Sequence, residues 1–366
     1  MSTNPTVVAS FKEQLAGYKS LLEPDVAQFC ERFEQEVQQD FGDYSLEAVK
    51  AFTSILTRGG KRVRGSLVMA AYEMAGGTDL SRVLPVARAM EILQVYLLIA
   101  DDIYDRSLTR RGGPTAHVMM RDLHQSNHWR GDAEHFGESV ASCATLIASN
   151  VAMEEITLAP LSDCAKVAIL RIVNKALRIT DYGQINDIVN EAVGTVATSQ
   201  VERTLIWKTA YYSFIGPLQI GAIAAGAKES DVASLHNYGL HMGLSFQIAD
   251  DILGTFGNEA ESGKSTMDDL REGKMTVLVS HALQHASRAG HRELRSYLGK
   301  SDLTLAEYER CKQIITETGS LAYARDMAVS HGKIAIEALE NAPASWRSDK
   351  LDFLRALANY VVTRKA

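Results

Sequence analysis

The chain has 366 residues, a formal net charge of -7, 7 prolines and 7% aromatic residues. Its mild acidity argues against a general nucleic-acid binder, so we expect no nucleic-acid partner. The scarcity of proline and aromatic residues favours helix over sheet. No uninterrupted apolar run reaches about 18 residues, so we expect no integral membrane segment.

The cysteines and the first residues bear on the compartment. The 4 cysteines are scattered without a C-x-x-C spacing, and we interpret them as reduced thiols in a cytoplasmic protein. Residues 1–10 lack a basic stretch followed by an apolar core, so we expect no signal peptide.

Helical periodicity runs through the chain, without the alternation and hairpin turns of strands. We interpret residues 1–40 as an N-terminal helical extension on a main body that spans residues 41–366. The helices expected in the main body include residues 46–56, 67–75, 81–105, 137–156, 165–190, 201–225 and 231–256. Gly216-Pro217 is expected to kink the helix over 201–225, because proline cannot donate a helical hydrogen bond. The pattern predicts a single all-α domain.

The pentapeptide Ile-Ala-Asp-Asp-Ile occurs twice, at residues 99–103 and 248–252, and Asp105 adds a third acid to the first copy. Adjacent carboxylates in an apolar run are costly unless a positive charge lies between them. A hard divalent cation such as Mg²⁺ prefers oxygen ligands. The acids could instead be solvated or paired with nearby arginines, but the repetition favours two metal sites on facing helices.

Basic residues accompany both strings. Lys61 and Arg64 follow a Gly-Gly turn at the start of a helix, where backbone N–H groups favour anions, although a solvated basic turn is the alternative. Arg110 and Arg111 lie in an expected loop, residues 107–115, and could grip a diphosphate or pair with the aspartates. In the polar segment 117–135 we interpret the histidines as loop residues rather than as metal ligands.

The combined pattern points to a phosphate ester with an apolar tail. Carboxylates would hold Mg²⁺, and lysine and arginine would hold the remaining phosphate charge. A Walker-type glycine-rich phosphate loop is absent from the sequence. An all-helical body with a central apolar cavity below the acids would accommodate the tail.

This set of motifs resembles the trans-isoprenyl diphosphate synthases, over residues 59–274. The first aspartate-rich motif of that family is matched by Asp101-Asp102-Ile103-Tyr104-Asp105 with Arg110-Arg111-Gly112, and the second by residues 246–251. The other matching positions are Gly60-Lys61, Arg64, Gln94, Gln184, Asp187 and Lys208-Thr209. The resemblance implies an all-α fold of the isoprenoid synthase type, in which residues 41–366 form the catalytic domain.

The resemblance also implies roles for individual residues. The implied Mg²⁺ ligands are Asp101, Asp105 and Asp250, supported by Asp102 and Asp251 and assisted by Asp187. The residues implied to hold the allylic diphosphate are Arg110, Lys208 and Lys264, and those for isopentenyl diphosphate are Lys61, Arg64, Arg111 and Gln94. The residues implied to stabilise a carbocation are Thr209, Tyr212 and Gln247, beside Phe246 in the substrate-binding set. Ionisation, condensation and proton loss would follow, in what is usually a homodimer.

Two departures from the family pattern stand out. The second motif usually ends in a further aspartate, but Gly254 occupies that position, so the second site depends on Asp250 and Asp251. Thr145-Leu146 stands where many members carry Gly-Asp, which affects the expected wall of the substrate pocket.

Product length in this family depends on bulk below the first motif. Leu97 lies most directly under Asp101 on a helical wheel, whereas Tyr96 lies on a shoulder, so its role as a floor comes from the resemblance. A single aromatic residue at the fifth position before Asp101 resembles the members that make geranylgeranyl diphosphate. Farnesyl or longer products, a class I terpene cyclase and a non-catalytic partner subunit are the alternatives.

Overall fold

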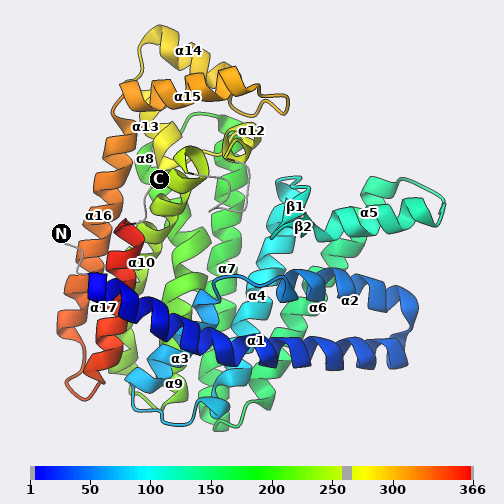
Figure 1. Cartoon of the computed structure of the whole chain (residues 1–366), viewed down its shortest axis with the longest axis vertical. Helices are drawn as coiled ribbons and strands as arrows, with labels where there is room; N and C mark the ends of the chain where they lie inside the picture. Colours follow the sequence, from blue (N-terminus) through cyan, green and yellow to red (C-terminus); the bar gives the residue numbers. More distant parts are fainter. Residues whose placement is uncertain (1–4, 258–265, 364–366) are drawn as a thin grey trace.

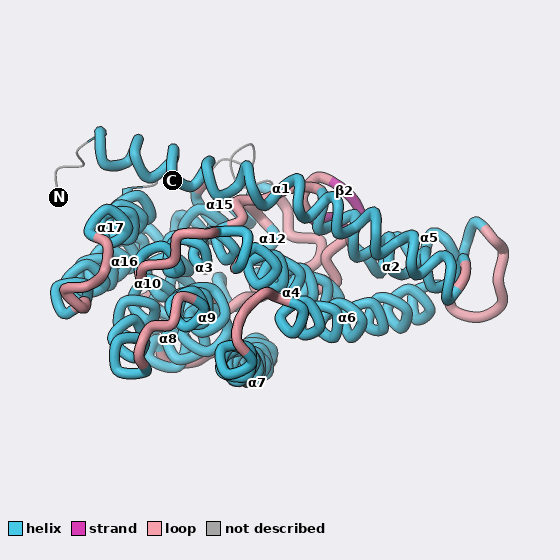
Figure 2. Tube along the Cα trace, turned by 90° about the horizontal axis from the view of Figure 1, so that it is seen from below, coloured by secondary structure: helices cyan, strands magenta, loops and turns pink. Residues whose placement is uncertain are grey.

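The computed structural model describes the backbone of residues 5–257 and 266–363, and the side chains of residues 11–257 and 266–363. The predicted all-α fold is confirmed, with a two-stranded hairpin as a small addition (Figures 1 and 2). The elements are α1 (Pro5–Phe41), α2 (Asp43–Thr57), α3 (Val63–Met74), η1 (Leu80–Arg82), α4 (Leu84–Tyr104), β1 (Thr109–Arg110), β2 (Gly113–Pro114), α5 (Ala116–Ser126), α6 (Ala133–Leu158), α7 (Asp163–Val193), α8 (Thr198–Leu205), η2 (Ile206–Ile215), α9 (Gly216–Ala224), α10 (Glu229–Phe256), α12 (Asp268–Glu272), α13 (Val277–His285), α14 (Arg288–Tyr297), α15 (Leu305–Glu317), α16 (Ser320–Ala338), η3 (Leu339–Asn341) and α17 (Ser348–Thr363).

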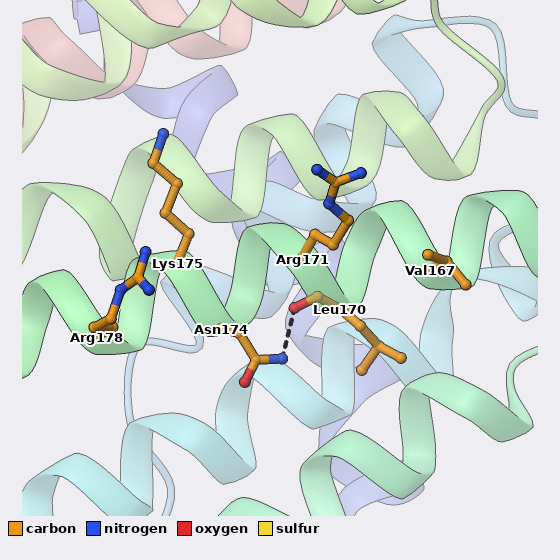
Figure 3. Close-up of a pocket in the computed structure, with 6 residues that line it drawn as sticks. All are labelled: Val167, Leu170, Arg171, Asn174, Lys175 and Arg178. Carbon is orange, nitrogen blue, oxygen red and sulfur yellow. Dashed lines mark hydrogen bonds between the residues drawn. The ribbon is translucent and has the colours of Figure 1, made fainter.

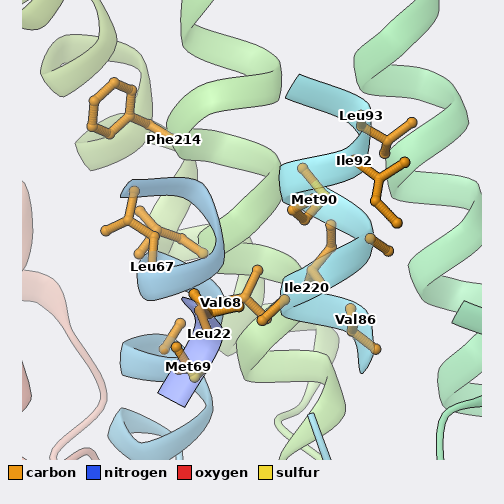
Figure 4. Packing of buried hydrophobic residues seen from close by; sticks show 14 of the residues in the cluster. Leu22, Leu67, Val68, Met69, Val86, Met90, Ile92, Leu93, Phe214 and Ile220 are labelled. Carbon is orange, nitrogen blue, oxygen red and sulfur yellow. The ribbon is translucent and has the colours of Figure 1, made fainter. Parts of the chain in front are cut away.

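Helices α4, α7, α10 and α16 run roughly upright in Figure 1, and α1 crosses in front of them. Two hydrophobic clusters form the core, and α10 contributes to both of them. Its Val232 and Met242 join the larger cluster, whereas Leu244 and Ile248 join the cluster made with α13 to α16. Figure 4 shows the larger cluster where α3, α4 and η2 meet. Because α10 packs into both clusters, the second acidic string that it carries is held by packing against both of them.

Helix α1 packs against the main body along its length. Its buried residues include Phe11, Leu22 and Phe29, which belong to the larger core cluster. The Tyr18 hydroxyl donates to Glu73 on α3 at 2.5 Å, and Lys350 on α17 lies 2.9 Å from the same carboxylate. The division of the chain near residue 40 stays a prediction, although the helix before it shares its core with the helices after it.

The region expected as one kinked helix over residues 201–225 differs from the prediction. It consists of α8, a ten-residue π-helix η2 and α9. The π-helix ends where Gly216-Pro217 opens α9, because Pro217 has no N–H to continue the hydrogen-bond ladder. The proline therefore begins a new helix instead of kinking a continuous one. Extended π-helical segments are rare and are frequently found at functional sites.

Residues 107–115 also differ from a plain loop. Arg110 pairs with Gly113 in a short antiparallel hairpin, and the turn residues Arg111 and Gly112 have φ values of 52° and 73°. Two successive positive φ values are typical of the tight turn that matches the twist of a hairpin. The histidine prediction was wrong in part, because His117 and His124 lie buried on α5 instead of in a loop.

Two further sequence predictions concern membrane-spanning helices and Lys264. Among residues 5–257 and 266–363, no helix combines the length and apolar character needed to cross a bilayer. Lys264, which was predicted to hold a diphosphate, lies outside the described residues.

Candidate active site

The predicted acids of α4 and α7 meet around the ammonium group of Lys208. Lys208 Nζ on η2 lies 3.0 Å from Asp101 Oδ1 on α4 and 2.5 Å from Asp187 Oδ2 on α7. Burial alone would lower the pKa of Lys208, but the charges of Asp101 and Asp187 raise it above its ordinary value. Lys208 therefore stays charged and joins three elements at one point.

Two glycines allow η2 to approach its neighbours closely. A Cβ at Gly183 on α7 would lie 2.3 Å from the backbone nitrogen of Lys208, and a Cβ at Gly243 on α10 would lie 2.5 Å from Cα of Ala210. Each glycine precedes a site residue by one helical turn: Asp187 follows Gly183 and Gln247 follows Gly243. The close packing of the backbones thus sets where Asp187 and Gln247 meet η2.

The second aspartate of the first string is held by the arginine hairpin. Asp102 is fully buried, and Arg110 Nε donates to its Oδ1 at 2.8 Å. Arg110 Nη2 also lies 3.7 Å from Asp101 Oδ2. The alternative that the sequence left open, pairing between the first acids and Arg110, is therefore present in the structure. Arg110 stands beside Asp101 and can turn toward an anion there.

The third acid of the first motif pairs with a lysine that was not among the predicted site residues. Lys274 Nζ, after α12, lies 2.7 Å from Asp105 Oδ2 and 3.0 Å from Glu272 Oε2. Burial, together with the charge of Asp101, raises the pKa of Asp105, whereas Lys274 opposes the rise. Glu191 on α7 was also missed. Burial, then the charges of Asp187 and Asp105, raises the pKa of Glu191 to about 8.

The second string extends into a chain of hydrogen bonds. Thr209 Oγ1 donates to Gln247 Oε1 at 3.0 Å, and Gln247 Nε2 donates to Asp251 Oδ1 at 2.8 Å. Burial, then the charge of Asp269, raises the pKa of Asp251 well above its ordinary value. Asp250 is exposed, and Phe246 packs against Phe214 with ring centroids 5.4 Å apart. The structure thus joins Thr209, Gln247 and Asp251 into one line from η2 to α10.

A second group of basic residues gathers at the start of α3, apart from Lys208. Arg64 stacks over the ring of Tyr212 at 4.4 Å, and its Nη2 donates to Ser213 Oγ at 2.6 Å. Arg111 Nη1 donates to the carbonyl oxygen of Ile55 at 2.9 Å. Burial, together with the charges of Arg62 and other nearby arginines, lowers the pKa of Arg111 to about 10. This clustering of cations is costly without an anion and fits a site for a second anionic group.

Two arginines that the sequence did not single out as site residues position this basic group. Arg62 is buried with φ 49°, and its Nη2 lies 3.0 Å from Glu23 Oε2. Arg58 Nη1 donates to the carbonyl oxygens of Pro114 at 2.7 Å and Arg110 at 3.2 Å. Arg58 therefore clamps the hairpin that carries Arg110 and Arg111. The bonds of Arg58 join its side chain to backbone more than 50 residues away, which no local pattern encodes.

Several predicted site residues carry buried polar atoms that lack a hydrogen-bond partner among the described residues. These atoms are Arg64 Nε, Gln94 Oε1, Gln184 Nε2 and Asp251 Oδ2. Buried polar groups in folded proteins nearly always have partners, so exceptions call for an explanation. Four such atoms among the predicted site residues indicate that a polar ligand completes the site.

The acids offer ligands suited to a divalent cation, but lysines stand between them. Within the described part of the chain, no three acidic, histidine or cysteine side chains converge closely enough to hold one metal ion. Lys208 separates Asp101 from Asp187, and Lys274 separates Asp105 from Glu272. The oxygen donors are of the kind that Mg²⁺ prefers, since it is usually bound by one or two carboxylates together with water and phosphate oxygens.

The residues predicted to set product length lie below the acids. Tyr96 and Leu97 are half-buried and pack against the larger core cluster. Burial, with the charge of Asp181 on α7, raises the pKa of Tyr96 to about 12. Of the pair predicted to affect the pocket wall, Thr145 is buried and Leu146 is exposed. The central apolar cavity itself stays a prediction.

A groove of about 470 Å³ lies elsewhere, on α7 (Figure 3). Its lining residues are Val167, Leu170, Arg171, Asn174, Lys175 and Arg178. They precede Asp187 by at least nine residues and include none of the predicted site residues. The groove is therefore separate from the acids and lysines described above.

Comparisons with known proteins agree with this site. The profile of the family described as Polyprenyl synthetase matches residues 47–315. A short chain isoprenyl diphosphate synthase of Methanothermobacter thermautotrophicus is 30% identical over 338 residues, which cover 92% of this chain and 97% of the relative. A geranylgeranyl diphosphate synthase of Saccharolobus solfataricus is 33% identical over 313 residues, covering 85% of this chain and 88% of the relative.

A solved structure shows the same fold. The crystal structure of a geranylgeranyl pyrophosphate synthase from Corynebacterium glutamicum, complexed with isoprenyl diphosphate and magnesium, matches with a TM-score of 0.89 at 31% identity. The match covers 95% of this chain and 99% of that one. The predicted family is thereby confirmed, and the chain belongs to the polyprenyl synthetase family.

Proposed function

We propose that the protein is a trans-prenyltransferase that condenses isopentenyl diphosphate with an allylic diphosphate to make all-trans geranylgeranyl diphosphate. The observation that carries this proposal is the presence of two separate cationic groups. Lys208 lies among the acids of α4 and α7, whereas Arg64 and Arg111 gather at the start of α3. A reaction that joins two diphosphate esters needs two such sites.

The allylic diphosphate would bind at the acids, with Asp101, Asp105, Asp187 and Asp250 as ligands of Mg²⁺. When bound, Mg²⁺ supplies neutralisation of the leaving diphosphate's charge. Lys208 adds a fixed positive charge beside Asp101, and Arg110 can turn from Asp102 toward the same diphosphate. Lys264 belongs to the same proposed set. Charges aimed at a leaving group stabilise the transition state for its departure.

Asp102 and Asp251 would support the metal sites indirectly. The contact of Asp102 is Arg110, so its role would be to position that guanidinium next to Asp101. Asp251 accepts from Gln247, whose carbonyl oxygen in turn accepts from Thr209. These hydrogen bonds fix the orientation of Thr209 and Gln247, which supports their proposed role in stabilising a carbocation by their oxygen dipoles.

Isopentenyl diphosphate would bind at the second basic group, through Lys61, Arg64 and Arg111, with Gln94 as a further contact. Arg64 Nε and Gln94 Oε1 have no hydrogen-bond partner among the described residues, and this supports the placement. Tyr212 would face the reacting carbons from beneath Arg64. The double bond of isopentenyl diphosphate then attacks the cation, and a proton is lost, with the departing diphosphate as the proposed acceptor.

The product length is proposed from Tyr96 and Leu97. Both residues lie on α4 below Asp101, and the ring of Tyr96 is half-buried. A chain growing downward from the acids would meet this ring. Farnesyl diphosphate and longer products are the alternatives within the same reaction.

The protein is also proposed to be a cytoplasmic homodimer. Tyr182, Ile185, Val189 and Val193 on α7 are exposed and recur at a spacing of three or four residues, so they share one face of the helix. A face of this kind favours burial against a second copy. The mass of the protein in solution, measured by light scattering, tests the proposal, and a monomer would contradict it.

One experiment separates the proposed function from its alternatives. The protein is incubated with Mg²⁺, isopentenyl diphosphate and dimethylallyl, geranyl or farnesyl diphosphate, and products are identified by carbon number. Geranylgeranyl diphosphate supports the proposal. A hydrocarbon formed without consumption of isopentenyl diphosphate would indicate a class I terpene cyclase, and no turnover in any mixture would indicate a non-catalytic partner subunit.

A further inference from the structure

The first turn of α3, which follows Lys61 and carries Arg64, is held between α1 and α4. Its third residue is Gly65, where a Cβ would lie 2.8 Å from Cδ1 of Leu22 on α1 and 2.9 Å from the carbonyl oxygen of Ala87 on α4 (Figure 4). A side chain at this position would collide with both helices. The glycine thus brings the start of α3 into direct contact with the N-terminal helix.

The N-terminal end of α3 is capped by a residue of α4. Arg62, at the N-cap position, forms no side-chain hydrogen bond with α3. The backbone N–H of Gly65 instead donates to Glu91 Oε1 on α4 at 2.9 Å. The N–H groups of a first helical turn have no partners within the helix, so a carboxylate stabilises them. Glu91 thereby fixes the beginning of α3 relative to α4.

The side chain of Arg62 connects this end of α3 to α1. It is fully buried, and its Nε and Nη2 donate to Glu23 Oε1 at 3.1 Å and to Glu23 Oε2 at 3.0 Å. Nη2 also donates to the carbonyl oxygen of Leu56 at 2.6 Å, and Nη1 lies 3.6 Å from Glu91 Oε2. Two parallel bonds between a guanidinium and a carboxylate fix the orientation of both groups. Because Arg62 has a φ of 49°, which non-glycine residues rarely adopt, these contacts also stabilise an otherwise unfavourable backbone conformation.

Arg62 is not itself placed to bind a substrate. Its side chain is buried against Glu23 and Glu91, whereas Lys61 is exposed and Arg64 is partly exposed. The charge of Arg62 nevertheless helps to lower the pKa of Arg111, so Arg62 lies close to the same basic group. Its position in the chain, between Lys61 and Arg64, makes its conformation decisive for where these two residues stand.

We infer that α1 is part of the proposed isopentenyl diphosphate site, in which Glu23 acts through Arg62 as a positioning residue for Lys61 and Arg64. The inference rests on the proposed function, because that function assigns the diphosphate of isopentenyl diphosphate to Lys61 and Arg64. Loss of the Glu23 carboxylate would release Arg62 from α1 and let the two substrate-binding residues shift. A shift of about 1 Å in a substrate contact can cost up to about 100-fold in rate.

The substitution Glu23→Gln tests the inference. It removes the charge and keeps the size of the side chain, and the variant should fold because this side chain is 32% exposed. The KM for isopentenyl diphosphate should rise by about ten-fold, since Glu91 still holds Arg62, while the KM for the allylic diphosphate stays within about three-fold of wild type. Asp25→Asn is the matched control, because Asp25 also lies on α1 and pairs with a buried arginine, Arg88 on α4, at 2.5 Å. An unchanged KM for isopentenyl diphosphate in Glu23→Gln, or an equal rise in both variants, would overturn the inference.

A double-mutant cycle shows whether Glu23 acts through Arg62. Lys19 also lies 3.8 Å from Glu23, so an effect through that lysine has to be separated. Arg62→Lys keeps the charge but lacks the planar fork that binds the Glu23 carboxylate at both oxygens. The two changes together should raise the KM for isopentenyl diphosphate by no more than about two-fold beyond the larger single effect, since changes in one interacting pair are not additive. Single effects that multiply in the double variant would overturn the inference.

Hydrogen–deuterium exchange separates a failure of this inference from a failure of the proposed function. The amides of Gly65 and Ser66 donate to Glu91 and to the carbonyl oxygen of Arg62. Without substrate, they should exchange faster in Glu23→Gln than in wild type or in Asp25→Asn, as measured by mass spectrometry of peptides from the start of α3. If the wild type makes no prenyl diphosphate, the proposed function is wrong, while exchange still decides whether Glu23 holds this turn. If the wild type is active and exchange in Glu23→Gln is unchanged, the function stands and the role of Glu23 does not.

Discussion

Replacing Lys208 with glutamine tests the link between the acids and the allylic diphosphate. Lys208 Nζ lies within 3.0 Å of Asp101 and Asp187, and its side chain is 23% exposed. Removing one charged group that stabilises a leaving anion costs about 100-fold to 1,000-fold in turnover, or about 2.7–4 kcal/mol. We therefore expect kcat/KM for the allylic diphosphate to fall by that factor.

The same substitution should affect stability less than activity. Breaking a fully buried ion pair costs about 3–5 kcal/mol, and partial exposure of all three side chains lowers that figure. We expect Lys208→Gln to remain folded, with a loss of at most about 3 kcal/mol in the free energy of unfolding. Urea denaturation, followed by circular dichroism, measures this loss.

The effects of Lys208→Gln on the kinetic constants for the two substrates test the proposed role of Lys208. Arg64 contacts Tyr212 and Ser213, and Arg111 contacts the backbone of Ile55. KM for isopentenyl diphosphate should therefore stay within about three-fold of wild type, while kcat/KM for the allylic diphosphate falls by the factor above. Lys175→Gln, on the exposed groove of α7, is the matched control and should leave both constants unchanged. A fall of less than ten-fold for the allylic substrate, or an equal effect on both substrates, would refute the role of Lys208.

Three further predictions follow from particular contacts. Asp101→Asn should reduce turnover by about 100-fold or more in a radiolabelled isopentenyl diphosphate assay, because it removes a proposed Mg²⁺ ligand charge; near-normal activity would contradict that role. Tyr96→Ala should lengthen the product, as read by chromatography of the dephosphorylated alcohols, and an unchanged length would rule out Tyr96 as the floor. The pKa of His331 is lowered to about 4 by burial and by His241, so the native state binds fewer protons than the unfolded state between about pH 4 and 6.5. Stability should fall as pH drops through that window, by at most about 1.4 kcal/mol per unit, and His331→Gln should flatten the dependence; a variant with the same pH slope of melting temperature would disprove this assignment.

Periodicity predicted the long helices because each buries an apolar face, and burial determines which turns of the chain are helical. The π-helix over Ile206–Ile215 could not be predicted in this way, since its residues are as apolar as those of a buried α-helix. Its different hydrogen-bond register accompanies close packing against Gly183 and Gly243, which lie on other helices. The hairpin at Arg110 was missed for a related reason. Two-residue strands are too short to show alternation, and Arg58 holds them from another element.

The sequence predicted which residues belong to the candidate site better than it predicted the contacts between them. The strings and the basic motifs named Asp101, Lys208 and Gln247, and these stay predictions as catalytic residues, although the structure brings Asp101 to Lys208 and joins Gln247 to Thr209. Lys274 and Asp269 were not among the predicted site residues. They reach Asp105 and Gly254 because α12 folds back toward α4 and α10, which local sequence patterns do not specify.

In each of the two identical strings, one aspartate is more accessible than the other, because neighbouring residues on a helix point about 100° apart. The first aspartate of each copy, Asp101 or Asp250, is the more accessible one, and the second is turned into the protein. The partners of the second aspartates differ: Asp102 meets the charged Arg110, whereas Asp251 meets the neutral amide of Gln247. A guanidinium compensates a buried carboxylate, but an amide does not, and the pKa of Asp251 is accordingly raised. The buried aspartate of the first copy is therefore charge-compensated by Arg110, whereas the buried aspartate of the second copy, Asp251, accepts from an amide and has a raised pKa.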